Sequence, residues 1–177
     1  MTPMADPATI RIQNLPLPRD IAGSPDAVAI TTLATPLMDG SAVEVLRGNW
    51  TAQTRAALHA LYRKGWILRG FDPARDQLLR EHKGNHTPLR VCRALLVTSD
   101  ASAGLCRQME RLLRHTAPRV IGTRLNIDGA TLGGVLFGPG RLAKCVLITR
   151  KQGVVAWLAA LAHQQVTPVD DNDTASR

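Results

Sequence analysis

Two arginines stand beside a short apolar stretch in LRVCRALLVTSD, residues 89 to 100. Residues 95 to 97 predict a buried strand, with Arg93 near its start and Arg90 three residues earlier. An arginine this close to a core either extends its guanidinium group to water or holds an anion. Because the planar guanidinium group can bind a carboxylate through two hydrogen bonds, the second alternative predicts an acidic ligand.

The other residues with chemical potential do not form a known catalytic or metal-binding motif. His82 and His86 precede Cys92, but a zinc site requires several convergent ligands, and the surrounding HKGNH predicts a solvated loop. GGVLFGPGR, residues 133 to 141, lacks the Gly-Lys-Ser/Thr ending of a phosphate-binding loop and is typical of a turn. We therefore expect neither a metal ion nor a cofactor.

The cysteines are odd in number and widely spaced, at Cys92, Cys106 and Cys145. Their apolar or amphipathic surroundings predict buried free thiols rather than a disulfide framework. Arg107 directly follows Cys106 and would favour a thiolate, but a buried structural thiol is the simpler interpretation. The Gly-x-Ser-x-Gly pattern of a serine nucleophile is absent from the sequence.

The composition predicts one globular domain. The chain has 177 residues, of which 45% are hydrophobic and 20% charged. We assign residues 1–168 to this domain and expect the polar, acidic residues 169–177 to be disordered. No apolar run approaches the roughly 20 residues of a membrane helix, and the first residues lack a secretory signal, so we expect a cytoplasmic protein without a membrane partner.

The charge predicts an anionic partner, because lysine and arginine give the chain a net charge of +8. A nucleic acid, an anionic membrane and a small acidic ligand are the three candidates. Nucleic-acid-binding proteins usually concentrate their cations on one element and add aromatic residues for stacking. Here the cations are spread along the chain and aromatic residues make up 3%, so nucleic acid is the less favoured partner.

Periodicity and capping residues predict both helices and strands. Thr51 precedes apolar residues at helical spacing and is a suitable N-cap, and Asp39 or Ser41 could cap a short helix before it. The predicted elements are a short edge strand at residues 10–12, a helix or strand at 26–38, helices at 39–50 and 51–66, a polar loop with one helical turn at 71–88, and an amphipathic helix at 102–114.

Three segments in the second half of the chain together resemble one enzyme family in their order and spacing. CRALLVTSD (92–100), AGLCR (103–107) and IGTRLNIDGATLGGVLF (121–137) are similar to segments of the chorismate lyase family, also called 4-hydroxybenzoate synthase. DGSAVEVL (39–46) is similar to the start of that family's early helix. The resemblance implies an α+β fold, in which helices pack on an antiparallel sheet of about six strands and the ligand is enclosed under flaps.

The resemblance also implies roles for five residues. Arg93 matches the family's catalytic arginine, which grips a carboxylate of the ligand, and Arg107 matches a second arginine. Leu132 and Gly133 match a Leu-Gly pair at the pocket, and Ala42 matches a position in the pocket wall. Two arginines would orient chorismate, a dicarboxylate, and stabilise the charge that develops as its enolpyruvyl ether leaves as pyruvate. The reaction requires no metal ion or redox cofactor.

The sequence departs from the family pattern near its end, where Pro168 replaces the expected glutamate. The resemblance also requires residues 104–113 to form a strand, with a helix starting near Thr116 and Pro118, whereas periodicity predicts a helix at 102–114. Three functions therefore stay open. The first is a chorismate-lyase-like protein that binds a small cyclic or aromatic carboxylate, with conversion of chorismate to 4-hydroxybenzoate and pyruvate as its specific form. The second is a non-catalytic domain that senses such a ligand, and the third is a basic nucleic-acid-binding protein.

Overall fold

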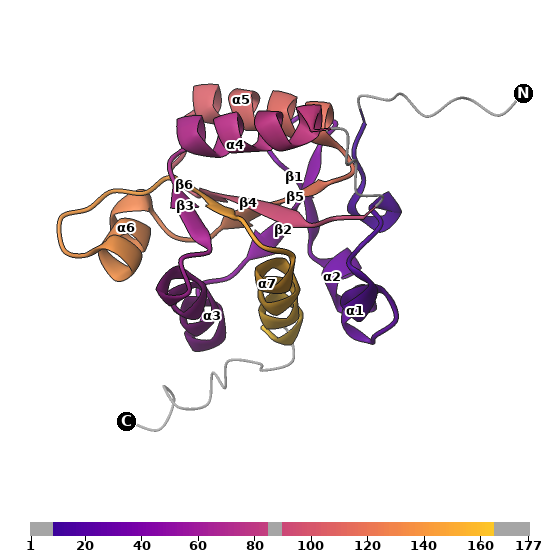
Figure 1. Cartoon of the computed structure of the whole chain (residues 1–177), viewed down its shortest axis with the longest axis horizontal. Coiled ribbons are helices and arrows are strands. Elements are labelled where there is room, and N and C mark those ends of the chain that lie inside the picture. The colour runs from indigo at the N-terminus through magenta and orange to yellow at the C-terminus, as the bar shows by residue number, and fades with distance from the viewer. Residues whose placement is uncertain (1–8, 85–89, 165–177) are drawn as a thin grey trace, which may run out of the picture.

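A six-stranded mixed sheet covered by helices on both faces forms the part of the chain that the computed structural model describes, residues 9–84 and 90–164. Helices α4 and α5 cover one face, and α1, α2, α3 and α7 cover the other (Figure 1). The strands are β1 (Ala34–Pro36), β2 (Glu44–Gly48), β3 (Ile67–Arg69), β4 (Arg93–Thr98), β5 (Val120–Leu125) and β6 (Cys145–Ile148).

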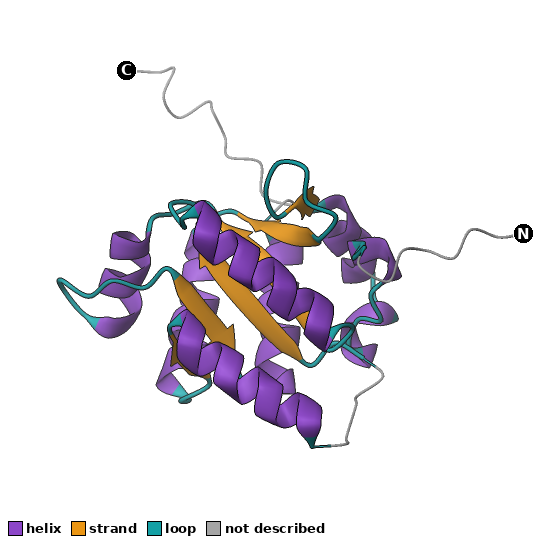
Figure 2. Cartoon of the chain, turned by 90° about the horizontal axis from the view of Figure 1, so that it is seen from above, coloured by secondary structure: helices purple, strands orange, loops and turns teal. Residues whose placement is uncertain are grey.

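The helices alternate with these strands along most of the chain. Seen from above, α4 and α5 lie side by side across the strands (Figure 2). Their bounds are η1 (Ile12–Asn14), α1 (Arg19–Ala22), α2 (Asp26–Thr32), α3 (Ala52–Arg63), α4 (Phe71–Lys83), α5 (Ala103–Thr116), α6 (Gly129–Phe137) and α7 (Lys151–His163). None of the described helices combines the length and the apolarity needed to cross a bilayer.

The sheet order is β1-β2-β5-β4-β6-β3. Pairs β1–β2, β4–β6 and β3–β6 are antiparallel, whereas β2–β5 and β4–β5 are parallel. The α+β class and the predicted number of strands are confirmed for the described residues, in a sheet that is mostly antiparallel. The parallel group β2-β5-β4 was not predicted. Because its strands are parallel, their carboxyl ends lie at one common edge of the sheet.

Two apolar clusters hold the layers together. Strand β4 is buried along nearly its whole length because helices cover both faces, and Leu95 and Leu96 contribute to different clusters. On the α7 side, the fully buried Trp157 donates its indole N–H to the hydroxyl of Thr123 at 3.2 Å. This bond satisfies a polar group that burial would otherwise leave unpaired.

Two predicted helices are confirmed. Thr51 caps α3, and its hydroxyl accepts a hydrogen bond from the backbone N–H of Thr54 at 3.2 Å. Helix α5 buries Met109 and Leu113, as its periodicity predicted. The alternative that the resemblance required, a strand over residues 104–113, is wrong, because the 3.6-residue spacing of the apolar side chains fits one helix face.

Two other segments differ from the prediction. Residues 71–88 were expected to form a polar loop with one helical turn, but Phe71–Lys83 is the helix α4, which buries Ala74 and Leu78 on one face. Charged residues dominate the sequence of α4, so the few apolar residues of this narrow face did not give a clear helical pattern. Residues 39–50 were expected to start a helix, but they form a turn and β2, because Val43 and Val45 alternate with the more exposed Glu44.

Helix α6 packs closely on the following loop through a glycine. A Cβ atom at Gly133 would overlap the backbone carbonyl of Arg141, whereas a Cβ atom at Gly134 would enter open space. The backbone of the loop cannot move away as a flexible side chain could. Gly133 therefore has a packing role in the described fold.

We expect Gly133→Ala to lower the free energy of unfolding by about 2 kcal/mol or more, because the added methyl group overpacks α6 against backbone. The matched control Gly134→Ala should raise it by about 0.5–1 kcal/mol, because alanine favours a helix interior. Urea denaturation measures both. Equal effects of the two substitutions would contradict the close approach at Gly133.

Candidate functional site

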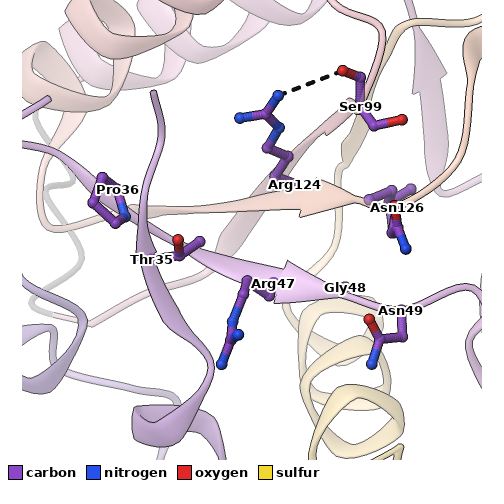
Figure 3. A pocket seen from close by; sticks show the side chains of 9 residues that line it. Thr35, Pro36, Arg47, Gly48, Asn49, Ser99, Arg124 and Asn126 are labelled. Atoms are coloured by element: carbon purple, nitrogen blue, oxygen red, sulfur yellow. Dashed lines mark hydrogen bonds between the residues drawn. The ribbon is translucent and has the colours of Figure 1, made fainter. Parts of the chain in front are cut away.

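A cavity of about 290 Å³ lies where the parallel strands β2, β5 and β4 end (Figure 3). In α/β sheets, ligands commonly bind at the carboxyl ends of parallel strands, because loops diverge there and leave a crevice. The lining residues are mostly polar or small: Thr35, Pro36, Arg47, Gly48, Asn49, Ser99, Arg124, Leu125 and Asn126.

The strand register brings two arginines to this cavity. Arg47 of β2 and Arg124 of β5 are direct partners in the parallel pair. Each is followed two residues later by an asparagine, and the backbone N–H of Asn126 donates to the carbonyl of Gly48 at 2.8 Å. The two strand ends therefore present Arg-Gly-Asn and Arg-Leu-Asn beside each other.

Both guanidinium groups are held by backbone carbonyls rather than by carboxylates. Arg124 donates to the carbonyls of Leu37 and Ser99, at 3.2 and 3.4 Å, and Arg47 donates to the carbonyl of Thr32 at 3.3 Å. Figure 3 shows the side chain of Arg124 extending toward Ser99 and that of Arg47 extending the other way. Within residues 9–84 and 90–164, neither arginine forms an ion pair, so the cavity carries uncompensated positive charge.

Asp100 fixes the loop that carries Ser99. Its carboxylate accepts hydrogen bonds from the hydroxyl of Thr98 at 2.7 Å and from the backbone N–H of Gly129 at 3.0 Å. These bonds lower the pKa of Asp100, the Thr98 bond most strongly. Ser99 itself donates its N–H and its hydroxyl to the carbonyl of Ile127. The loops after β4 and β5 are therefore tied together at the rim of the cavity.

Gln164, at the end of α7, fixes the opposite side. Its amide oxygen accepts the backbone N–H of Asn49 at 2.8 Å, and its amide nitrogen donates to the carbonyl of Arg47 at 3.1 Å. Thr54 also donates its hydroxyl to the carbonyl of Asn49, at 2.7 Å. The carboxyl end of β2 is thus held in place by side chains from α3 and α7.

Arg93, the principal sequence candidate, lies at the opposite end of β4 from this cavity. Its Nε is 3.1 Å from Oε2 of Glu81, and Arg119 pairs with the same carboxylate. The Arg93 side chain is 19% exposed. The question raised by LRVCRALLVTSD therefore has a structural answer: the anion beside Arg93 is a carboxylate of the protein.

The other four candidates do not converge with Arg93. Arg107 lies on the exposed side of α5, so the strand position on which its match depended does not exist. Leu132 is fully buried in the core, Gly133 packs on Arg141, and Ala42 lies in the turn before β2 rather than in a helix. Among the described residues that line the 290 Å³ cavity, none is one of these five candidates.

One sequence signal could have pointed to the cavity. The pattern Arg-x-Asn occurs at residues 47–49 and again at 124–126, each time near the end of a segment with several apolar residues. Polar residues that follow two buried strands meet if the strands are parallel neighbours. Because residues 39–50 were expected to be helical, the first of these two copies was not expected at a strand end.

A second groove, of about 560 Å³, lies between α4 and α5. It is larger than the first, but its floor is apolar, with Leu79 and Leu112. Its Arg75 already pairs with Asp72 and Asp76, at 3.5 and 3.3 Å. Arg111 in this groove also forms no ion pair among the described residues. We consider the smaller cavity the stronger candidate because it lies where the parallel strands end and both of its arginines lack a carboxylate partner among the described residues.

The cysteines and histidines do not add a chemical site. All three cysteines are free and buried, as predicted, and burial raises the pKa of Cys145 to about 12 and that of Cys92 above its usual value. The rings of His82 and His115 lie against each other at a tilt of 51°, with centroids 4.9 Å apart, and His86 lies outside the described residues. The described residues hold no group of three or more side chains arranged to bind a metal ion.

Comparisons with known proteins assign no function. No protein-family model and no curated protein matches the sequence. A solved structure of a protein of unknown function from Bacillus halodurans is similar, with a TM-score of 0.43 and 18% sequence identity. The similarity covers 63% of this chain and 98% of that protein.

We expect Glu81→Gln to lower the free energy of unfolding by about 3 kcal/mol, because it leaves the buried Arg119 and the mostly buried Arg93 without a counter-charge. Glu110→Gln is the matched control. It removes a carboxylate whose described ion pair is with one arginine, Arg114, which is 36% exposed and stays solvated, so its effect should stay below about 1 kcal/mol. Urea denaturation of both variants measures the free energy of unfolding. Equal losses of stability would contradict a structural role for the ion pairs of Glu81 with Arg93 and Arg119.

Asp100 should contribute a pH-dependent part of the stability. Its folded-state pKa is lowered, so its stabilisation is present above the unfolded-state pKa of about 3.9 and is lost as the pH falls through the folded-state value. At pH 7 we expect Asp100→Ala to be about 1 kcal/mol less stable than the wild type. Thermal denaturation from pH 2 to 7 should show this difference vanishing at the acid end. A difference that is constant with pH would contradict the assigned hydrogen bonds.

Proposed function

We propose that the chain binds a small anionic ligand, a cyclic or aromatic carboxylate, in the cavity at Arg47 and Arg124. The observation that carries the proposal is the pair of guanidinium groups without a carboxylate partner among the described residues. A ligand carboxylate would accept charge-assisted hydrogen bonds from either group. Asn49, Asn126 and Ser99 add polar groups that can orient the rest of the ligand.

The cavity size favours a ligand with one ring. Its volume of about 290 Å³ is at the lower end of the range for small-molecule sites. The net positive charge supports an anionic ligand, and a cyclic or aromatic carboxylate is the class that the sequence resemblance implied. The geometry favours Arg124 over Arg93 as the residue that holds the carboxylate, because Arg93 already pairs with Glu81.

Conversion of chorismate to 4-hydroxybenzoate and pyruvate is the more specific form of this proposal. Its support is the sequence resemblance, and pyruvate release from chorismate tests it. Saturable binding of 4-hydroxybenzoate without pyruvate release would favour the alternative function, a non-catalytic domain that senses such a ligand. Binding of DNA or RNA that weakens steeply between about 50 and 200 mM salt would instead favour the nucleic-acid alternative.

The experiment that tests the site compares two arginine variants. We expect Arg124→Gln to weaken binding of 4-hydroxybenzoate by about 10- to 100-fold, the loss typical of a charge-assisted hydrogen bond. Arg107→Gln should bind as tightly as the wild type. It is the matched control because Arg107 is exposed on α5 and is the arginine that the sequence resemblance placed in the site. Isothermal titration calorimetry measures the affinities, and the reverse pattern would contradict the proposal.

A further inference from the structure

The groove of about 560 Å³ between α4 and α5 is separate from the proposed ligand site. All of its lining residues belong to these two helices, among them Phe71, Arg75 and Leu79 of α4 and Arg111, Leu112 and His115 of α5. In Figure 2, which looks onto α4 and α5, no other described element crosses over them. The groove is therefore open along its outer side, which suits a segment of protein chain better than an enclosed small molecule.

The two helices run in the same direction. His82 and His115, near the carboxyl ends of their helices, lie with their ring centroids 4.9 Å apart. The lining residues of α4 are spaced four apart, so they form one row along the helix. This row spans about two helical turns, or roughly 12 Å. A third helix could pack its side chains between the two helices over this length.

The floor of the groove is apolar and continuous with the core. Leu112 is 5% exposed and belongs to the apolar cluster on this side of the sheet. Phe71 and Leu79 are partly buried and pack against the same cluster. Apolar side chains of a partner would extend this cluster and would be removed from water, which is favourable.

Positive charge collects toward the carboxyl ends of the two helices. Arg111 is exposed and forms no ion pair among the described residues. Lys83 follows Leu79 by four residues and so continues the α4 row, and it also has no acidic partner in the described part of the chain. The exposed His115 adds a third group that can carry positive charge. This end of the groove therefore attracts acidic groups.

The carboxylates near this end are already engaged. Glu81 is bound by Arg93 and Arg119, and Glu110 lies 2.6 Å from Arg114. At the amino end of the groove, by contrast, two aspartates of α4 pair with the arginine that lines it there. The groove thus combines an apolar floor with positive charge at one end.

This pattern discriminates among the possible occupants. A second copy of this chain, docked symmetrically through the same groove, would bring like charges together. A nucleic acid could use the cations, but the recessed floor offers it one aromatic ring, that of Phe71. An acidic amphipathic helix matches both the floor and the positive end. Residues 165–177, which hold Pro168 and the tail predicted to be disordered, lie outside the described residues, so no segment of this chain is assigned to the groove.

We propose that the groove between α4 and α5 docks an acidic amphipathic helix of another protein. Apolar side chains of that helix, at three- and four-residue spacing, occupy the floor at Phe71, Leu79 and Leu112. Its acidic side chains lie near Arg111 and His115, where the groove has no free carboxylate of its own. The interaction goes beyond the proposed ligand binding and does not depend on it.

A random library of peptides of about 16 residues, or four to five helical turns, tests the proposal without assuming a partner. The library is displayed on phage and selected against the full chain. We expect the enriched peptides to be acidic, with apolar residues at helical spacing. In fluorescence anisotropy at about 50 mM salt, an enriched peptide should bind Arg111→Glu about 10-fold more weakly than the wild type, because repulsion replaces an ion pair.

Arg63→Glu is the matched control. It makes the same charge change at an exposed arginine in the last turn of α3, which covers the other face of the sheet, so the peptide affinity should stay unchanged. A reversed charge in the peptide then separates a direct contact from a structural effect. One substitution of a peptide acidic residue by lysine should restore tight binding to Arg111→Glu.

Three results would overturn the proposal. The first is a selection that enriches no peptide or only basic ones. The second is an acidic peptide that binds the wild type and Arg111→Glu equally. The third is a single-stranded RNA of about 20 nucleotides that binds the chain, loses affinity in Arg111→Glu and displaces the enriched peptides, which would assign the groove to nucleic acid.

Discussion

The parallel register of β2 and β5 is the constraint on which the candidate site depends. It places Arg47 directly opposite Arg124, so two like charges stand on neighbouring strands. Their side chains extend in opposite directions from the paired backbones, that of Arg124 toward Ser99 and that of Arg47 toward Thr32. Here backbone carbonyls of Thr32, Leu37 and Ser99 accept hydrogen bonds from the two guanidinium groups, but carbonyls carry no net charge. A bound anion would supply the missing negative charge, which is why we connect this register with ligand binding.

The contrast with the opposite end of the sheet supports the same conclusion. There Arg93 and Arg119 share the carboxylate of Glu81, and the charge is largely compensated within the protein. Both ends of the parallel strands therefore hold two arginines, but among the described residues a carboxylate pairs with them at the amino end alone, since Asp100 at the carboxyl end bonds to Thr98 and Gly129 instead. The loops at the carboxyl end are tied by Asp100 and Gln164 through hydrogen bonds to backbone groups, which leave the arginines unpaired.

Local features of the sequence predicted part of this structure. The Thr51 cap and the helical spacing of Met109 and Leu113 were sufficient for α3 and α5, because short-range interactions determine both helices. Helix α4 was missed because its charged residues conceal a narrow apolar face. The site was missed for another reason: Arg47 and Arg124 are far apart in the sequence, and they meet through a strand pairing that no local pattern specifies.

The most direct test of the central claim is an NMR titration that follows the Nε–Hε signals of individual arginine side chains as 4-hydroxybenzoate is added. The account predicts saturable shifts of the signals of Arg47 and Arg124, while the signal of Arg93, which pairs with Glu81, stays unchanged. Shifts of the Arg93 signal with unchanged Arg47 and Arg124 signals would contradict it and would move the ligand to the other end of β4.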